Sequence, residues 1–156
     1  LAMGDALAVA LYKRRDFTAP DFKRFHPGGS LGQQLIHVRD LHHIDMPLVD
    51  PGDVMSDVLL LMTSKSFGCV GVVGADDSLT GVITDGDLRR HMSSDMLSMT
   101  AEEVMTAGPK SIGPDALAAE AIGLMNQLQI TSLFVVEEDK PMGILHLHDC
   151  LRAGLS

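Results

Sequence analysis

The seven histidines of this 156-residue sequence are the side chains best suited to proton transfer or metal binding. His42 and His43 are adjacent, while His146 and His148 are two residues apart, a spacing that places both on one side of a strand. A tetrahedral metal site would need further ligands, and no cysteine or carboxylate set in the sequence completes one. The sequence therefore predicts no metal site.

A further histidine, His26, stands directly before Pro27, Gly28 and Gly29. An imidazole can accept or donate a proton near neutral pH, which makes it a candidate for acid–base catalysis. On spacing alone, however, the glycines are typical of a turn before a helix that begins at Ser30, with His26 as an ordinary surface residue. Both interpretations stay open at this point.

A hydroxyl, a carboxylate and two guanidinium groups follow one another at Thr84, Asp87, Arg89 and Arg90. A carboxylate accepts hydrogen bonds from hydroxyl groups, and a guanidinium group pairs with anions. Alternatively, the two arginines lie on the solvated face of a helix. They are two of only six Lys or Arg residues after residue 40, so few side chains in this part of the chain can pair with a bound anion.

The charges divide the chain at about residue 40. Residues 1–40 carry six Lys or Arg and four Asp or Glu, whereas residues 41–156 carry six and seventeen, a net charge of −11. Such an acidic surface repels nucleic acids and anionic membranes. The sequence contains no run of 18 apolar residues, and two cysteines cannot form a disulfide framework. We therefore expect a cytoplasmic protein with neither a nucleic acid nor a membrane as its partner.

The acidic part contains an internal repeat. The stretch at residues 49–54 recurs at residues 112–117 with an offset of 63, and this offset holds through Leu61-Met62 against Leu124-Met125. One residue is then dropped, so that residues 81–83 match residues 143–145 and Asp87 matches Asp149 at an offset of 62. The chain thus carries two copies of one unit of about 60 residues, which is near the lower size limit for independent stability.

Each copy predicts the same order of elements, strand, helix, strand, strand, helix, and so an α/β (α+β) fold class. Apolar residues with helical spacing are Val54, Val58, Leu61 and Met62 in the first copy and Leu117, Ala121, Leu124 and Met125 in the second. We expect Asp53 and Asp115 to cap these helices at their N-termini. The predicted strands span residues 69–73, 79–83, 132–136 and 142–147, and the closing helices span residues 85–92 and 149–155. Residues 93–100 are predicted to link the copies.

This duplicated unit resembles a CBS (cystathionine-β-synthase) domain pair. The resemblance rests on the run Gly81-Val82-Ile83-Thr84-Asp85-Gly86-Asp87 at the end of the predicted hairpin, and on residues 101–106 followed by Pro109, which resemble the entry into a second CBS repeat. It implies two repeats, residues 41–98 and 99–156, packed with pseudo-two-fold symmetry. It also implies that such pairs associate into flat dimers, so a homo-oligomer is expected.

The resemblance further implies a nucleotide-type ligand, with AMP, ADP or ATP as the family default. In the family the motif hydroxyl faces phosphate or ribose and the aspartate accepts hydrogen bonds from the ribose. Repeat one has both groups, whereas repeat two retains Asp149 but has His146 in place of the hydroxyl. The candidate ligand-binding residues are Val49, Thr84, Asp87, Arg89, Arg90, Ile112, Thr131, Ser132, His146 and Asp149. No cofactor is expected to be required.

Residues 1–40 are similar to the C-terminal end of the sugar-isomerase (SIS) domain of D-arabinose 5-phosphate isomerases, in which a CBS pair follows directly. The similarity rests on the runs GDALAVAL and RFHPGGSLG. It implies that His26 contributes to a catalytic centre that interconverts D-ribulose 5-phosphate and D-arabinose 5-phosphate for synthesis of the lipopolysaccharide sugar Kdo. The activated end product, CMP-Kdo, then joins the adenine nucleotides as a candidate effector. Because a sugar-phosphate pocket needs the rest of the SIS domain as a partner, these 156 residues alone are expected to be inactive.

Two functions compete at this stage. The first is a regulatory CBS pair that senses a nucleotide-type ligand and transmits its occupancy to the SIS domain. The second is a ligand-free CBS module that holds catalytic domains together. We expect Asp87→Ala to abolish ligand binding under the first hypothesis and to have no effect under the second.

Overall fold

The computed structural model describes residues 35–155, and in these the predicted α/β fold of two similar units is confirmed. His26 and residues 1–34 lie outside the described residues. Repeat one contains β1 (Leu48–Val49), α4 (Met55–Lys65), β2 (Cys69–Val73), β3 (Leu79–Thr84) and α5 (Asp85–Arg90). Repeat two contains β5 (Ser111–Ile112), α7 (Ala118–Leu128), β6 (Ser132–Glu137), β7 (Lys140–His146) and α8 (Leu147–Arg152). The remaining elements are η1 (Val38–Asp40), η2 (Met96–Ser98), α6 (Ala101–Val104) and β4 (Thr106–Ala107).

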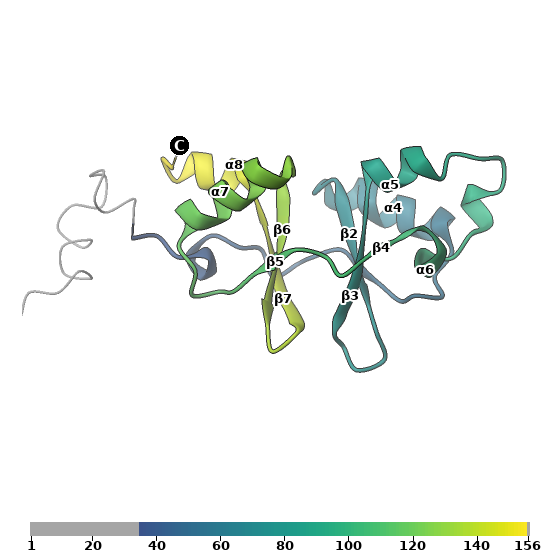
Figure 1. Ribbon diagram of the computed structural model, residues 1–156, viewed down its shortest axis with the longest axis horizontal. Helices are drawn as coiled ribbons and strands as arrows, with labels where there is room; N and C mark the ends of the chain where they lie inside the picture. The colour runs from purple at the N-terminus through teal and green to yellow at the C-terminus, as the bar shows by residue number, and fades with distance from the viewer. Residues whose placement is uncertain (1–34, 156) are drawn as a thin grey trace, which may run out of the picture.

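Each repeat is built on a small mixed sheet. The strand orders are β1-β2-β3-β4 and β5-β6-β7, with β1 parallel to β2 and β5 parallel to β6, while the two hairpins are antiparallel. Both hairpins shift register at equivalent places, between Val72 and Val73 and between Val135 and Val136. Figure 1 shows the two repeats side by side, with α4, α5, α7 and α8 above the sheets and both hairpin turns pointing the opposite way.

The long helices begin later than predicted. Val54 and Leu117, and not Asp53 and Asp115, are the residues at the N-cap positions of α4 and α7. The Asp53 carboxylate instead accepts a hydrogen bond from the backbone N–H of Asp50 at 2.9 Å, and Asp115 pairs with Arg39 at 2.6 Å. Both aspartates are therefore used in the loops that precede the helices.

The closing helices also differ from their predicted bounds. α8 begins at Leu147 rather than at Asp149, and α5 ends at Arg90 rather than at residue 92. Asp149, like Asp87, lies in the first helical turn, where a carboxylate is favoured by the unpaired backbone N–H groups and the helix dipole. The predicted start of the closing helix in repeat one, Asp85, is confirmed, and the helix of repeat two begins at the equivalent position, Leu147.

Two segments that precede the repeats each pack on the other repeat. We call residues 36–43 strap 1 and residues 99–107 strap 2. Val38 N–H donates to Ala116 O at 2.9 Å in repeat two, and Ala101 N–H donates to Asp53 O at 2.8 Å in repeat one. Strap 1 then bridges β7 through His43 and Ile144, while strap 2 pairs with β3 as the strand β4.

Both straps cross their sheets above a glycine. A Cβ atom on Gly81 would collide with the side chain of Met105 in strap 2, and a Cβ atom on Gly143 would come within 2.9 Å of the His43 carbonyl oxygen in strap 1. A larger residue would push the strap away from the sheet, so glycine is needed at both places because of this close approach.

Each repeat has its own core, and a third cluster joins the two. Met55, Val58 and Val70 belong to the core of repeat one, and Met125 and Leu145 to that of repeat two. The third cluster centres on three buried residues, Cys69, Phe134 and Ile144. None of the described helices is long and apolar enough to cross a membrane.

Candidate functional site

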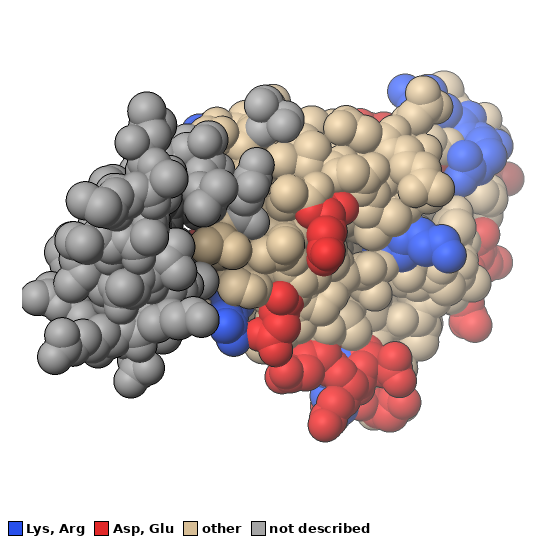
Figure 2. All heavy atoms as spheres, turned by 60° about the vertical axis from the view of Figure 1, so that its left-hand side comes forward, with Lys and Arg blue, Asp and Glu red and all other residues tan. Residues whose placement is uncertain are grey.

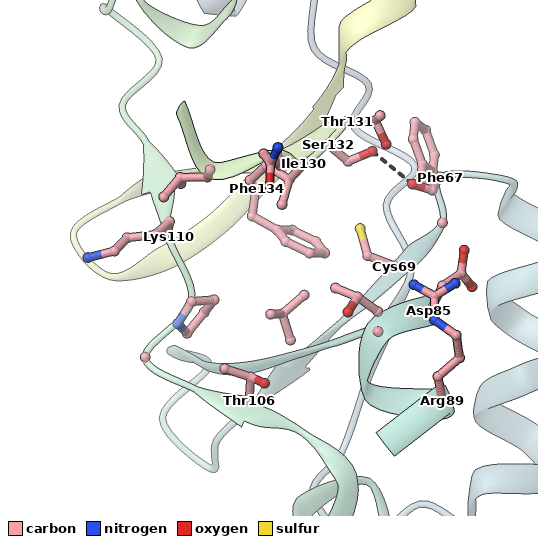
Figure 3. A pocket seen from close by; sticks show the side chains of 18 residues that line it. Phe67, Cys69, Asp85, Arg89, Thr106, Lys110, Ile130, Thr131, Ser132 and Phe134 are labelled. Carbon is pink, nitrogen blue, oxygen red and sulfur yellow. Dashed lines mark hydrogen bonds between the residues drawn. The ribbon is translucent and has the colours of Figure 1, made fainter. Parts of the chain in front are cut away.

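A cavity of about 560 Å³ opens between the two repeats, beside the motif of repeat one. The end of β3 and the start of α5 form one wall through Thr84, Asp85 and Arg89, and the start of β6 forms the opposite wall through Thr131 and Ser132 (Figure 3). The segment that follows strap 2 closes a third side. Its lining residues there are Gly108, Pro109 and Lys110.

The cavity combines apolar surface with a few polar groups of both signs. Figure 3 shows the Phe134 ring directed into the space between the walls, with Ile130 beside it. Arg89 and Lys110 supply the positive charges among the lining residues, from two different sides, and Asp85 supplies the negative one. Such a cavity suits a molecule with a flat apolar part and an anionic part.

Asp87 lies behind this cavity and does not line it. Its side chain is only 2% exposed, and its carboxylate accepts hydrogen bonds from Thr84 N–H at 2.8 Å, from the Thr84 hydroxyl at 2.5 Å and from the Thr106 hydroxyl at 2.6 Å. Arg90 also pairs with it. Burial by itself would raise the pKa of Asp87, but the hydrogen bonds from Thr106 and Thr84 and the charge of Arg90 together lower it. Asp87 is thus an ionised carboxylate whose bonding capacity is used within the protein.

The motif of repeat two has the same architecture with different side chains. Asp149 occupies the position of Asp87, and His43 of strap 1 occupies the position of Thr106, since both pairings lie at the same place in the two sheets. His43 Nε2 lies 2.9 Å from an Asp149 carboxylate oxygen. Its ring also stacks at a tilt on Phe67, with centroids 5.5 Å apart.

His146 stands where repeat one has Thr84, and it does not act as a hydroxyl would. Its ring Nδ1 accepts a hydrogen bond from His148 N–H at 3.1 Å, and the two imidazoles meet edge to face with centroids 4.8 Å apart. Burial lowers the pKa of His146, and the neighbouring His148 lowers it further, against the opposing charge of Asp149. Rings from four residues, His43, Phe67, His146 and His148, therefore gather at the second motif.

The comparisons with known proteins agree with this duplicated architecture. The model of the CBS domain matches residues 38–94 and again residues 101–156. The chain belongs to the CBS-domain family. Its two repeats form a CBS pair, the arrangement that the resemblance predicted.

The curated relatives of this CBS pair are proteins about twice as long. The chain is 44% identical to arabinose 5-phosphate isomerase KdsD of Salmonella typhi and of Escherichia coli strain K12, over 99% of this chain and 49% of each relative. It is also 35% identical to the uncharacterized protein RP505 of Rickettsia prowazekii, over 100% of this chain and 50% of the relative. The chain thus spans about half the length of the curated relatives it matches.

Solved structures share the fold at low sequence identity. The CBS-domain protein ATU1752 from Agrobacterium tumefaciens superposes with a TM-score of 0.69 at 20% identity, covering 78% of this chain and 96% of that one. CBSX2, solved in complex with AMP, has a TM-score of 0.66 at 23% identity, covering 76% and 96%. The CBS pair of MJ0100, solved with 5′-methylthioadenosine and S-adenosyl-L-methionine, has a TM-score of 0.67 at 18% identity, covering 76% and 94%.

The CBS fold separates the predicted ligand-binding residues into three groups. Those that line the cavity are Thr84, Arg89, Thr131 and Ser132. Those at the two motifs but outside the cavity lining are Asp87, Arg90, His146 and Asp149. The remaining two belong to the repeats themselves, since Val49 is buried in the core of repeat one and Ile112 packs against the core of repeat two. Val49 and Ile112 do not flank this cavity, because their strands point them into the separate cores.

Several lining residues of the CBS pair are absent from the predicted set. Phe67 and Phe134 are the only Phe, Tyr or Trp residues after residue 40, and this scarcity was a signal that could have marked them. Thr106 and Lys110 enter the site through strap 2 and the segment after it, whose pairing with repeat one is a long-range contact. No local sequence pattern predicts such a contact.

The two cysteines and the histidines form no further chemical centre in the described part of the chain. No group of three or more His, Cys, Asp or Glu residues in that part is placed to hold a metal ion. Burial raises the pKa of the Cys69 thiol to about 12, and burial also raises that of Cys150. Cys69 lines the cavity, but as a protonated thiol beside Ser132 it contributes shape rather than reactivity.

Proposed function

We propose that this CBS pair is the ligand-sensing regulatory part of a D-arabinose 5-phosphate isomerase, and that its cavity binds a nucleotide-type molecule. The observation that carries the proposal is the cavity itself, which both repeats line and which combines an apolar wall with two cations. A ligand in this position touches both repeats at once, so its binding changes how they are held together. The 44% identity to arabinose 5-phosphate isomerase KdsD supports the link to the isomerase.

The cavity offers a place for each part of a nucleotide. Ile130, Phe134 and Val82 provide apolar surface for a base. Arg89 and Lys110 provide charge for a phosphate, and they are two of the six cations of an otherwise acidic module. Figure 2 shows acidic side chains gathered toward the lower edge of one face. Because such a surface repels anions, an anionic ligand needs a local pair of cations to bind.

The hydroxyl groups of a ribose meet Asp85, Thr84 and Thr131 before they can meet Asp87. Asp87 is closed off by Thr84, Thr106 and Arg90, and becomes available only when one of these partners moves away. We therefore assign Asp87 as a positioning residue that holds Thr84 and strap 2 in place. The AMP bound to CBSX2, and the 5′-methylthioadenosine and S-adenosyl-L-methionine bound to MJ0100, support a nucleotide as the class of ligand.

Titration calorimetry with AMP, ATP, CMP and CMP-Kdo tests this proposal. We expect heat from at least one of the four, and about tenfold weaker binding after Arg89→Ala or Lys110→Ala, because each removes a charge-assisted contact. Lys140→Ala is the matched control, since it removes an exposed cation at the first residue of β7, outside the cavity lining. Absence of heat from all four ligands, or an equal loss in the control, would contradict the proposal.

The second candidate function is an oligomerisation module that binds no ligand. It is favoured by Leu60 of α4 and Leu151 of α8, which are 71% and 48% exposed on helices that lie on the same side of the molecule (Figure 1). Sedimentation of the wild type and of Leu60→Glu tests it. A dimer that Leu60→Glu dissociates, together with no heat in the titrations, would favour this function over ligand sensing.

The longer protein would add the catalytic domain as the partner of the CBS pair. We propose that His26 belongs to its catalytic centre, where an imidazole can transfer the proton that moves between neighbouring carbons during isomerisation. In the full-length isomerase, His26→Asn should abolish turnover of D-arabinose 5-phosphate while leaving the melting temperature unchanged. Turnover close to that of the wild type would refute this assignment.

A further inference from the structure

The two straps are built by the same hydrogen bonds but are held with different strength. Ala118 N–H donates to Ile36 O at 2.8 Å, and the equivalent Met55 N–H donates to Met99 O at 2.9 Å. Arg39 N–H donates to Pro114 O and Glu102 N–H donates to Pro51 O, both at 3.0 Å. Since these backbone contacts correspond one for one, any difference between the straps comes from side chains and from their last residues.

The side chains hold strap 2 more firmly. Strap 2 buries Ala101 and Val104 completely, with Met99 and Met105 partly buried beside them. Strap 1 buries only Val38 completely, with Ile36 and Leu41 partly buried beside it. Strap 2 also ends in a two-residue ladder with β3, whereas strap 1 ends in a single bridge between His43 and Ile144. On burial alone, strap 1 should open at a lower free energy.

Strap 1 has one ion pair among exposed side chains, between Arg39 and Asp115 at 2.6 Å, whose side chains are 56% and 77% exposed, so it adds little stability. The better-buried carboxylates that fasten the straps, Asp87 and Asp149, differ in the same direction as the buried apolar surface. Asp87 is 2% exposed and binds Thr106 of strap 2 within a set of contacts that also includes Thr84 and Arg90. The Asp149 side chain is 15% exposed, and its contacts are His43 at 2.9 Å and Arg152 at 3.5 Å. The His43 side chain is 48% exposed, so water reaches this contact directly.

We propose that the contact between His43 and Asp149 is a releasable clasp, and that strap 1 detaches locally from repeat two while strap 2 stays bound to repeat one. Strap 1 is the route by which the chain enters the CBS pair from residues 1–34, and Figure 1 shows it passing along repeat two before it reaches repeat one. The clasp therefore controls how firmly the preceding part of the protein is joined to the pair. This inference does not depend on any ligand of the cavity.

Hydrogen–deuterium exchange on the 156-residue chain tests the clasp. Amides of residues 36–43 should exchange at least tenfold faster than those of residues 99–107, after correction for intrinsic rates. His43→Ala should speed exchange in strap 1 by a further fivefold to tenfold, the effect of one lost hydrogen bond, and leave strap 2 unchanged. Thr106→Ala is the matched variant and should speed exchange in strap 2 instead. Equal exchange in the two straps of the wild type would overturn the proposal.

A double-mutant cycle tests whether His43 acts through Asp149. Asp149→Asn should speed exchange in strap 1 about as much as His43→Ala does, and the double variant should add nothing further. Trypsin gives an independent measurement, because Arg39 is a cleavage site in strap 1 and strap 2 contains no Lys or Arg. Additive effects of the two substitutions, or cleavage at Arg39 that His43→Ala leaves unchanged, would show that the contact does not fasten the strap.

Discussion

Asp87→Ala should destabilise the protein whether or not the cavity binds a ligand. The substitution removes the acceptor of the Thr84 N–H, of the Thr84 hydroxyl and of the Thr106 hydroxyl, and the ionic partner of Arg90. It thereby breaks the cap of α5 and the contact that fastens strap 2. Loss of ligand binding in this variant would not separate a sensor from a ligand-free module, because the site that surrounds the residue is disturbed as well.

The expected loss in the free energy of unfolding follows from how exposed the partners of Asp87 are. Arg90 is 62% exposed and can turn to water, so its share is small. Each of the three hydrogen bonds to the buried carboxylate contributes about 1 kcal/mol net, because water binds the same groups in the unfolded chain. Asp87→Ala should therefore lower the free energy of unfolding by about 3 kcal/mol. Asp149→Ala is the matched control. Its partners His43 and Arg152 are 48% and 79% exposed, which predicts a loss of about 1 kcal/mol or less in the free energy of unfolding.

Urea unfolding followed by circular dichroism measures both variants. A difference of about 2 kcal/mol corresponds to midpoints about 1 M apart in urea. Because the pKa of Asp87 is lowered in the folded protein, its stabilisation is present above the unfolded pKa of about 4 and is lost as the pH falls through the folded value. The two variants should therefore differ fully at pH 7 and progressively less below pH of about 4. Equal losses at pH 7 would refute the reasoning.

Three further predictions use other parts of the pair. Gly81→Ala should cost about 1–3 kcal/mol in urea unfolding because its Cβ meets Met105, whereas Gly123→Ala, in an open position of α7, should be neutral or stabilising. The pKa of His146 is lowered in the folded protein, so its neutral imidazole favours folding. The free energy of unfolding should therefore fall as the pH drops from about 6.5 through the folded pKa. His146→Asn should reduce this fall, measured by melting curves between pH of about 7.5 and about 5.5. Cys69, with a pKa of about 12, should resist iodoacetamide at pH 8 until the protein unfolds; rapid labelling of the native protein would contradict its burial.

The elements that sequence reasoning predicted best are those set by local composition. The strand predicted at residues 69–73 is observed at those bounds, because an apolar run rich in valine is followed by a turn that begins at Gly74. The prediction that Asp53 and Asp115 cap the long helices is wrong, because both carboxylates bind partners in or near the preceding loops. Residue propensity does not decide between a helix cap and such a loop contact. Local signals thus located the elements but not their first residues.

The role of Asp87 shows why the candidate site was harder to predict. Thr84 and Asp87 are three residues apart at a helix start, which is the spacing of a capping box, and this local use of the carboxylate competes with ligand binding. The straps could not be predicted from periodicity, since His43 and Ile144 are about a hundred residues apart in the chain. Only the offset of 63 residues, extended back from Val49 to residue 36, would have indicated that the repeat includes its strap.

The exchange of straps also bears on how such a pair could have arisen and how it can be divided. A chain containing one repeat without the other repeat's strap would leave Ala118 or Met55 without its backbone partner and would expose part of a core. Two identical copies of a single repeat could make the same contacts by trading straps, as a domain-swapped homodimer does. The present chain has the geometry of such a dimer with its two subunits joined end to end. Cutting the connection between the repeats should therefore leave two pieces that reassociate, whereas either piece alone should fail to fold.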